Sequence, residues 1–107
     1  MYDALQAVSL AAVVPDGSRA SLLADTGRPI GSISIQRVTA GASFFIRIGN
    51  AQWIPISGPC VFYGFDPIKE GILGAFFRND VAQAGASFDA VIGYISDRDY
   101  AQLRAQQ

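Results

Sequence analysis

Glycine and proline interrupt this sequence every few residues, and the segments between them are rich in isoleucine, valine and aromatic residues. Eleven glycines and five prolines are spread along the 107 residues, which divides the chain into short segments. Isoleucine and valine together number eighteen against six leucines, and twelve residues are aromatic. β-Branched and aromatic side chains fit a pleated, half-buried sheet, whereas helical cores rely more on leucine and alanine. The chain is therefore predicted to be all-β with a small helical contribution.

Period-2 alternation of apolar and polar residues is clearest between Gly31 and Ile48. Ile33 and Ile35 alternate with serine and glutamine, which is typical of a half-buried strand. The segment 40–42 (Ala-Gly-Ala) interrupts the pattern, which resumes at Phe44. We therefore predict that Gly31 to Ile48 forms a β-hairpin.

Further strands are expected between the remaining turn signals. Pro55 limits one of them to a sheet edge or a bulge, and 72–78 is apolar on both faces, as expected for a strand covered on both sides. The expected segments are Leu5–Val14 (a strand rather than a short helix), Trp53–Ile56, Cys60–Phe65, Ile72–Arg78 and Phe88–Ile95. About seven short strands at such spacing predict an antiparallel β-sandwich, jelly-roll-like, or a small barrel.

The end of the chain differs from the rest. Ser96 is followed three residues later by Asp99, a spacing that resembles a helix capping box, and 100–107 is long enough for two helical turns. We expect one domain over 1–107, with a β core at 1–95 and a helical tail at 96–107.

The residues that most enzymes use are missing. Histidine is absent, and the single cysteine, Cys60, has no histidine to act as its base and no second thiol with which to form a disulfide or a zinc site. The glycine-rich pieces 71–74 and 85–87 lack the spacing and the lysine of a phosphate loop. Four of the six candidate carboxylates lie directly beside Gly, Pro or Asn, where a carboxylate typically shapes a turn, and we expect that role for the set: Asp16, Asp25, Asp66, Glu70, Asp80 and Asp89. We predict no enzymatic activity, no catalytic residue, no metal and no cofactor.

Charge is sparse and balanced. Charged residues make up 16% of the chain and the net charge is -1, which gives no reason to expect a nucleic-acid partner. Arg37 and Arg47 are expected to share one face of the predicted hairpin near Phe45, as solvated or interface residues. The longest apolar run near the start, Leu10–Val14, is too short to span a membrane, and no basic leader precedes it, so we expect a protein that is soluble when made. So little charge indicates a surface that is buried against a partner or against copies of the same chain.

Aromatic residues concentrate between 53 and 65. Trp53, Phe62, Tyr63 and Phe65 could form part of the core or a contact surface, because neighbouring residues of an extended strand cannot all point the same way. We therefore take Trp53, Phe62, Tyr63 and Phe65, together with Tyr100 in the tail, as candidate interface residues.

Two stretches of the chain resemble small β proteins of tailed bacteriophage virions. The first carries Phe-Ile-Arg-Ile-Gly at 45–49, then Trp53, Pro55-Ile56, Gly58 and Gly64-Phe65. The second is a strand that ends at Asn79, a Gln-Ala-Gly turn at 83–85 and an apolar closing strand from Phe88 to Tyr94. The resemblance covers about half of the chain, and neither the segment 66–70 nor the tail after Ser96 has a counterpart in it.

The resemblance implies a structural role in a virion. Proteins of this kind act as head decoration, cement or spike components, often as trimers, and this chain would be made in the host cytoplasm and bind subunits such as the major capsid protein. Sparse charge and the lack of a catalytic set agree with a subunit present in many copies. The alternative hypothesis is a carbohydrate-binding β-sandwich module for host attachment, with Trp53 and Tyr63 as a stacking platform.

Overall fold

A computed structural model describes residues 2–24, 28–63 and 65–106. It contains eight strands, two short 3-10 helices and one α-helix. The strands are β1 (Tyr2–Ser9), β2 (Leu22–Ala24), β3 (Ile30–Gln36), β4 (Phe44–Ile48), β5 (Ile54–Ile56), β6 (Cys60–Phe62), β7 (Ala75–Arg78) and β8 (Ser87–Tyr94). The 3-10 helices are η1 (Arg19–Ser21) and η2 (Gly71–Leu73), and the α-helix is α1 (Asp97–Ala105).

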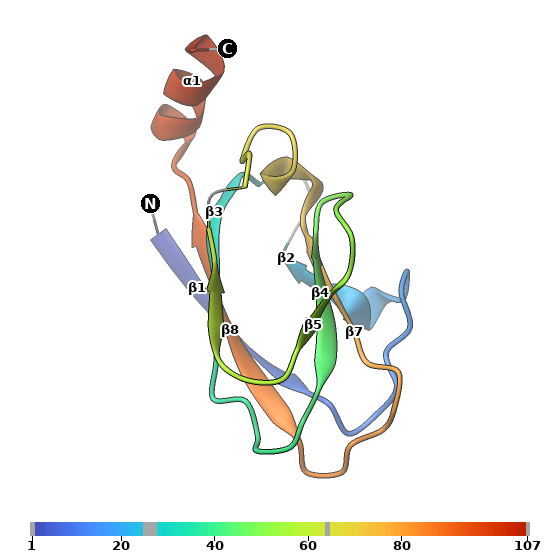
Figure 1. The fold of residues 1–107 in the computed structure, drawn as a ribbon. Helices are drawn as coiled ribbons and strands as arrows, with labels where there is room; N and C mark the ends of the chain where they lie inside the picture. The colour runs from blue at the N-terminus through green and yellow to red at the C-terminus, as the bar shows by residue number, and fades with distance from the viewer. Residues whose placement is uncertain (1, 25–27, 64, 107) are drawn as a thin grey trace.

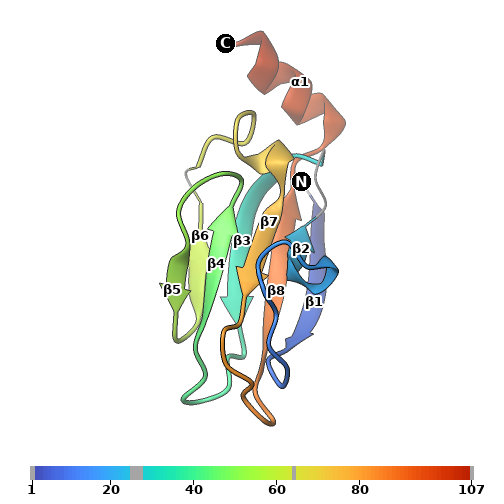
Figure 2. The ribbon, with the colours of Figure 1, turned by 90° about the vertical axis from the view of Figure 1, so that its right-hand side faces the viewer.

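The strands form two antiparallel four-stranded sheets that lie face to face (Figures 1 and 2). The first sheet has the order β1-β8-β3-β6 and the second has the order β2-β7-β4-β5. This confirms the expected all-β architecture of two antiparallel sheets. The two sheets are not joined into a closed barrel, so the alternative of a small barrel is wrong.

Alternate side chains of both sheets meet in the space between them. Ile33 and Ile35 from β3 and Ala90 and Ile92 from β8 face Ile46 and its neighbours on β4, and all of these side chains are buried. Phe88 links the two sheets, because its ring stacks on Phe44 at 4.1 Å and meets Phe77 edge-on at 5.7 Å. The period-2 pattern at Ile33 and Ile35, which resumes at Phe44, thus matches the buried faces of β3 and β4.

The predicted hairpin from Gly31 to Ile48 is wrong, because β3 and β4 belong to different sheets. Both edges of β3 are taken by β8 and β6. Arg37, with φ of 52°, turns the chain away at the end of β3, and Thr39 then bonds to Ser87 at the start of β8 through a backbone hydrogen bond of 3.0 Å. The turn signal at 40–42 is real, but the turn leads from one sheet to the other.

Several strand limits also differ from the expected ones. β1 ends at Ser9, whose hydroxyl accepts a hydrogen bond from the Ala11 amide at 3.2 Å, and Val14 forms only an isolated bridge with Asn79. The expected strand at 72–78 begins as the helix η2, and its outward face is not covered, because Phe76 and Arg78 are half-buried. The strand expected at 88–95 is confirmed by β8. The expected edge position of Pro55 is confirmed by β5, which is an edge strand of the second sheet.

The helix after Ser96 is present and projects from one end of the two sheets (Figure 1). The Ser96 hydroxyl accepts a hydrogen bond from the Asp99 amide at 3.2 Å, as a capping serine should. No residue of α1 is buried, so the two sheets do not depend on its packing.

Candidate functional site

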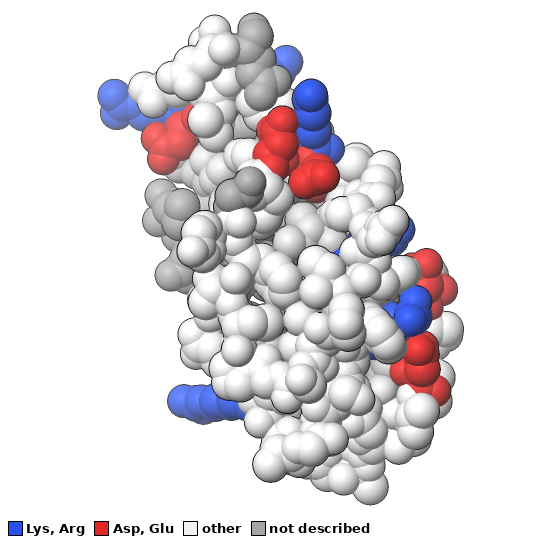
Figure 3. Space-filling view, viewed as in Figure 1, with Lys and Arg blue, Asp and Glu red and all other residues white. Residues whose placement is uncertain are grey.

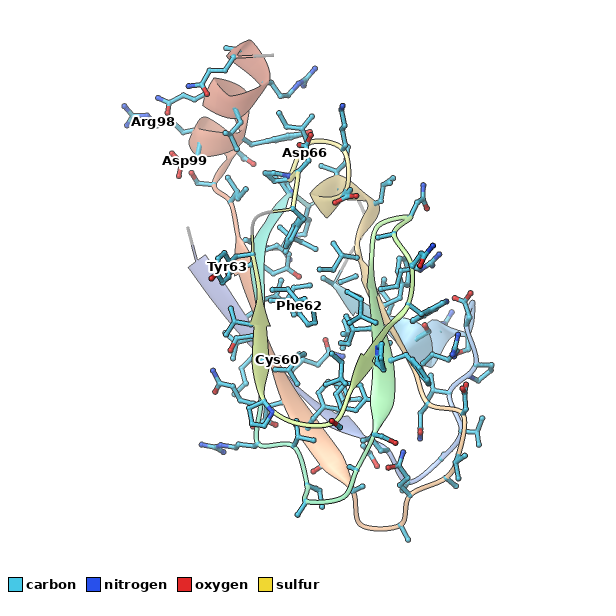
Figure 4. The ribbon with its side chains drawn as sticks, viewed as in Figure 1. Cys60, Phe62, Tyr63, Asp66, Arg98 and Asp99 are labelled. Carbon is cyan, nitrogen blue, oxygen red and sulfur yellow. The ribbon has the colours of Figure 1, made fainter. Side chains whose placement is uncertain are left out.

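The five aromatic residues expected at an interface are distributed over three regions. Phe62 and Phe65 are partly buried and pack against the core. Tyr63 is 78% exposed, and Figure 4 shows it pointing away from the sheets while Phe62 points between them. Trp53 lies just before β5 on the second sheet, and Tyr100 lies half-buried on α1. The structure therefore does not bring these residues into one cluster, and their role at an interface stays a prediction.

A different group forms around Trp53 on the outside of the second sheet. We call Phe45, Arg47, Trp53, Phe76 and Arg78 the arginine–aromatic surface. Phe45 and Arg47 alternate with the buried residues of β4, and Phe76 and Arg78 alternate with those of β7, so all four point outward. The register of β4 against β7 places Phe45 opposite Arg78 and Arg47 opposite Phe76. Each arginine thus lies between aromatic residues.

The guanidinium groups lie over the rings at contact distance. The Arg47 guanidinium carbon is 5.1 Å from the centre of the Trp53 ring and 4.8 Å from that of Phe76. The Arg78 guanidinium carbon is 4.3 Å from the centre of the Phe45 ring and 4.9 Å from that of Trp53. Such contacts are worth about 0.5–1 kcal/mol each at exposed sites and more where water is excluded. Trp53 therefore contacts both arginines.

Two aspartates neutralise this surface. Arg78 Nε donates a hydrogen bond to Asp80 Oδ1 at 2.9 Å, and Arg47 Nη2 lies 3.7 Å from Asp16 Oδ1. Figure 3 shows charged side chains at the helical end and along the side of the second sheet, one basic side chain at the lower left, and uncharged surface over most of the face between them. Among the described side chains, Arg47 Nε is a buried nitrogen without a hydrogen-bond partner. The surface therefore carries little net charge, and the unpaired Nε is buried beneath it.

An open depression of about 400 Å³ adjoins Phe45. It is lined by Ser43, Phe45, Asn79, Asp80, Val81 and Gln83. The Gln83 amide bridges its sides: Nε2 donates to Ser43 O at 2.7 Å and to Asn79 Oδ1 at 2.8 Å, and Oε1 accepts from the Ser43 amide at 2.9 Å. These bonds fix the positions of Ser43, Asn79 and Gln83 relative to one another at the border of the arginine–aromatic surface.

Groups able to carry out chemistry are not gathered at this surface. In the described parts of the chain, no three His, Cys, Asp or Glu side chains lie close enough to hold a metal ion. Asp66 Oδ1 accepts hydrogen bonds from the amides of Ile68 and Lys69, which confirms a turn-forming role for that carboxylate. Cys60 is a free thiol on β6, and partial burial raises its pKa, which disfavours the nucleophilic thiolate.

The sequence identified only part of this surface. Arg47 and Phe45 were expected together, but Arg37 lies on the first sheet, where it pairs with Asp89 at 3.6 Å, so its placement beside Arg47 is wrong. Phe76 and Arg78 were missed as site residues. A signal was present, because the pattern Phe-x-Arg occurs in both β4 and β7.

Comparison with known proteins adds no relative: no family model, no curated protein and no solved structure matches this chain. Over the described residues, no helix has the length and apolar character needed to cross a membrane.

Proposed function

We propose that this chain is a non-enzymatic structural protein of a phage virion, which decorates or stabilises the capsid by docking its arginine–aromatic surface on a neighbouring subunit. The observation that carries this proposal is the composition of that surface. Arginine and tryptophan are the residues most enriched among interface hot spots, and here they lie together, half-buried, on an open sheet face.

The charge of the surface favours a protein partner. Asp16 and Asp80 each lie within 4 Å of an arginine, so the surface lacks the excess positive charge that phosphate recognition requires.

The strand order supports a jelly roll, which is a more specific description of the fold than a β-sandwich. β1 pairs with β8, β2 with β7, β3 with β6 and β4 with β5, so the chain runs as one long antiparallel ribbon rolled into two sheets. Viral capsid proteins and lectins both use this architecture, so it agrees with a virion role by analogy of fold alone.

Carbohydrate binding, the alternative, receives less support from the geometry. Trp53 and Tyr63 lie on different sheets, and both guanidinium groups occupy positions over the Trp53 ring. A stacking platform for a sugar needs an open aromatic face.

Sedimentation with capsids tests the proposal. Recombinant protein is mixed with particles assembled from the major capsid protein of the same genome, and bound protein is quantified after a sucrose gradient. We expect binding that Trp53→Ala weakens by about 30-fold, the loss of a hot spot worth about 2 kcal/mol. Tyr63→Ala is the matched control, because Tyr63 is an exposed aromatic on the other sheet. Equal binding by both variants, or binding to immobilised glycans but not to particles, would overturn the proposal.

A further inference from the structure

Strand β1 has an unusual free edge. It is an edge strand of the first sheet (Figure 2), eight residues long, with a continuous register against β8. The other edge strands, β2, β5 and β6, have three residues each, and β5 carries Pro55. β1 has no proline or lysine and only one charged residue, Asp3. Proteins normally protect long edges with such devices, so this edge is open to pairing.

The hydrogen bonds around β1 define which backbone groups point to that edge. The Leu10 amide bonds to Ala86 on the β8 side, and the next β8 residue, Ser87, bonds away from β1 to Thr39. Because antiparallel bonding alternates, the even-numbered residues of β1 bond to β8. The amides and carbonyls of Asp3, Leu5, Ala7 and Ser9 therefore point to the outer edge, where no described strand pairs with them.

The side chains of β1 are also uncovered. Leu5 is 69% exposed on the outer face of the first sheet. Ala4 and Gln6 point to the same side as the buried Val8, yet they are exposed too, since the facing strand β2 has only three residues. A partner strand thus meets no obstacle from the described side chains at positions 4 to 7.

We propose that β1 pairs antiparallel with β1 of a second copy of this chain, about a two-fold axis at Gln6. Among the described strands, only another β1 offers an edge of equal length, because the remaining edge strands have three residues each. With Gln6 opposite the partner's Gln6, all four outward-pointing residues find partners, which gives about eight hydrogen bonds.

This register also suits the side chains and charges. It places Leu5 beside the partner's Ala7, a large residue against a small one on the outer face. In this register residue 3 pairs with the partner's Ser9 and not with its own copy. A register centred on Leu5 or Ala7 leaves outward-pointing residues unpaired.

The pairing uses the first sheet and is independent of the arginine–aromatic surface and of the virion role. It gives a dimer of 11.4 kDa chains, whereas the resemblance to virion proteins implies a trimer, so native mass separates the two. One strand pair buries less area than a standard interface, and we expect a dissociation constant on the order of micromolar.

Cysteine cross-linking tests the register. In a Cys60→Ser background, Gln6→Cys should form a disulfide-linked dimer under mild oxidation, because directly opposed residues across such a pair have Cα atoms about 4.5 Å apart. Ala4→Cys is the matched control: it is exposed on the same side of the same strand, but its copy lies about 13 Å away along the pair. Equal or no cross-linking of the two variants would overturn the register.

Charge substitution tests the edge. We expect Leu5→Lys to raise the dimer dissociation constant about tenfold or more, measured by light scattering over a concentration series, because two lysines then lie close together and apolar contact is lost. Val61→Lys, at an exposed valine of the same sheet on the opposite edge, should leave the dimer unchanged. A monomer at all concentrations, or a dimer lost only in Val61→Lys, would refute the proposal.

Discussion

Replacing Asn79 by aspartate should destabilise the protein strongly at neutral pH and much less in acid. Asn79 is 1% exposed, and its Nδ2 donates hydrogen bonds of 2.9 Å to the carbonyls of both Leu10 and Ala12. Its Oδ1 accepts the bond from Gln83 Nε2 that shapes the depression beside Phe45. One buried amide thus joins the end of β7 to the segment after β1.

The expected loss follows from these bonds. Aspartate has nearly the same shape, but a carboxylate has no donor, so both bonds to Leu10 and Ala12 are lost and three oxygen atoms face one another. Each lost hydrogen bond costs about 1 kcal/mol, and the buried carboxylate oxygen that is left without a donor costs about 1–3 kcal/mol more, while the Leu10 carbonyl keeps its bond from the Gln83 amide. We expect a loss of about 3–5 kcal/mol at pH 7, a large part of the about 5–15 kcal/mol that stabilises a small domain.

The sign of the pH dependence is opposite to that of a salt-bridged aspartate. Burial beside two carbonyls favours the neutral acid, so the pKa of the introduced carboxyl is raised in the folded state above its unfolded value of about 3.9. The protonated form can donate to one of the two carbonyls. The variant therefore loses least stability below the unfolded pKa and progressively more as pH rises through the folded pKa.

Urea denaturation at pH 4, 5, 6 and 7, followed by Trp53 fluorescence and far-UV circular dichroism, measures this effect. The difference in unfolding free energy between wild type and Asn79→Asp should grow with pH. Asn79→Ala is the control, because it removes the same donor without adding a titratable group, and its loss should not depend on pH. A loss that is equal at all four pH values, or below about 1 kcal/mol at pH 7, would refute this reasoning.

Three further measurements address other parts of the structure. Phe88→Ala should cost about 3–5 kcal/mol in urea denaturation, because the ring is fully buried against two others, whereas Phe88→Leu should cost clearly less. Gly49→Ala should lower the melting temperature more than Gly41→Ala: both have positive φ, but only at Gly49 would a Cβ lie 2.9 Å from a backbone oxygen. Burial raises the pKa of the Cys60 thiol, so the protein should lose stability as pH rises from the ordinary pKa of a thiol through that raised pKa. Cys60→Ala should remove this part of the pH dependence in urea denaturation.

Local patterns in the sequence predicted local structure well. The segment 88–95 was correctly predicted as a strand, β8, Pro55 predicted an edge strand, and Ser96 predicted the start of α1. Each of these features depends on residues within a few positions of one another. Backbone sterics, capping and side-chain periodicity act at that range.

The choice of partner strand could not be predicted in this way. β3 and β4 alternate correctly and are separated by a turn, yet β3 pairs with β8, more than fifty residues away. A hairpin is the least costly pairing in loop entropy, but the energy of burying Ile33 and Ile35 between two sheets depends on the whole chain. Short-range rules carry no information about that energy.

The arginine–aromatic surface depends both on local sequence pattern and on the choice of partner strand. Its residues help to specify the register of β4 against β7, and that register in turn brings them together. A slip of one residue between β4 and β7 would turn Phe45 and Arg47 into the core. A slip of two residues in one direction would set Arg47 opposite Arg78, and in the other direction it would set Phe45 opposite Phe76 and leave Arg47 opposite Gly74. Of these registers, only the observed one places both Arg47 and Arg78 opposite aromatic residues and keeps the two positive charges apart. The repeated Phe-x-Arg pattern therefore has a structural reason to exist apart from any partner, and Arg47→Met with Arg78→Met should weaken this register while Trp53→Ala leaves it intact.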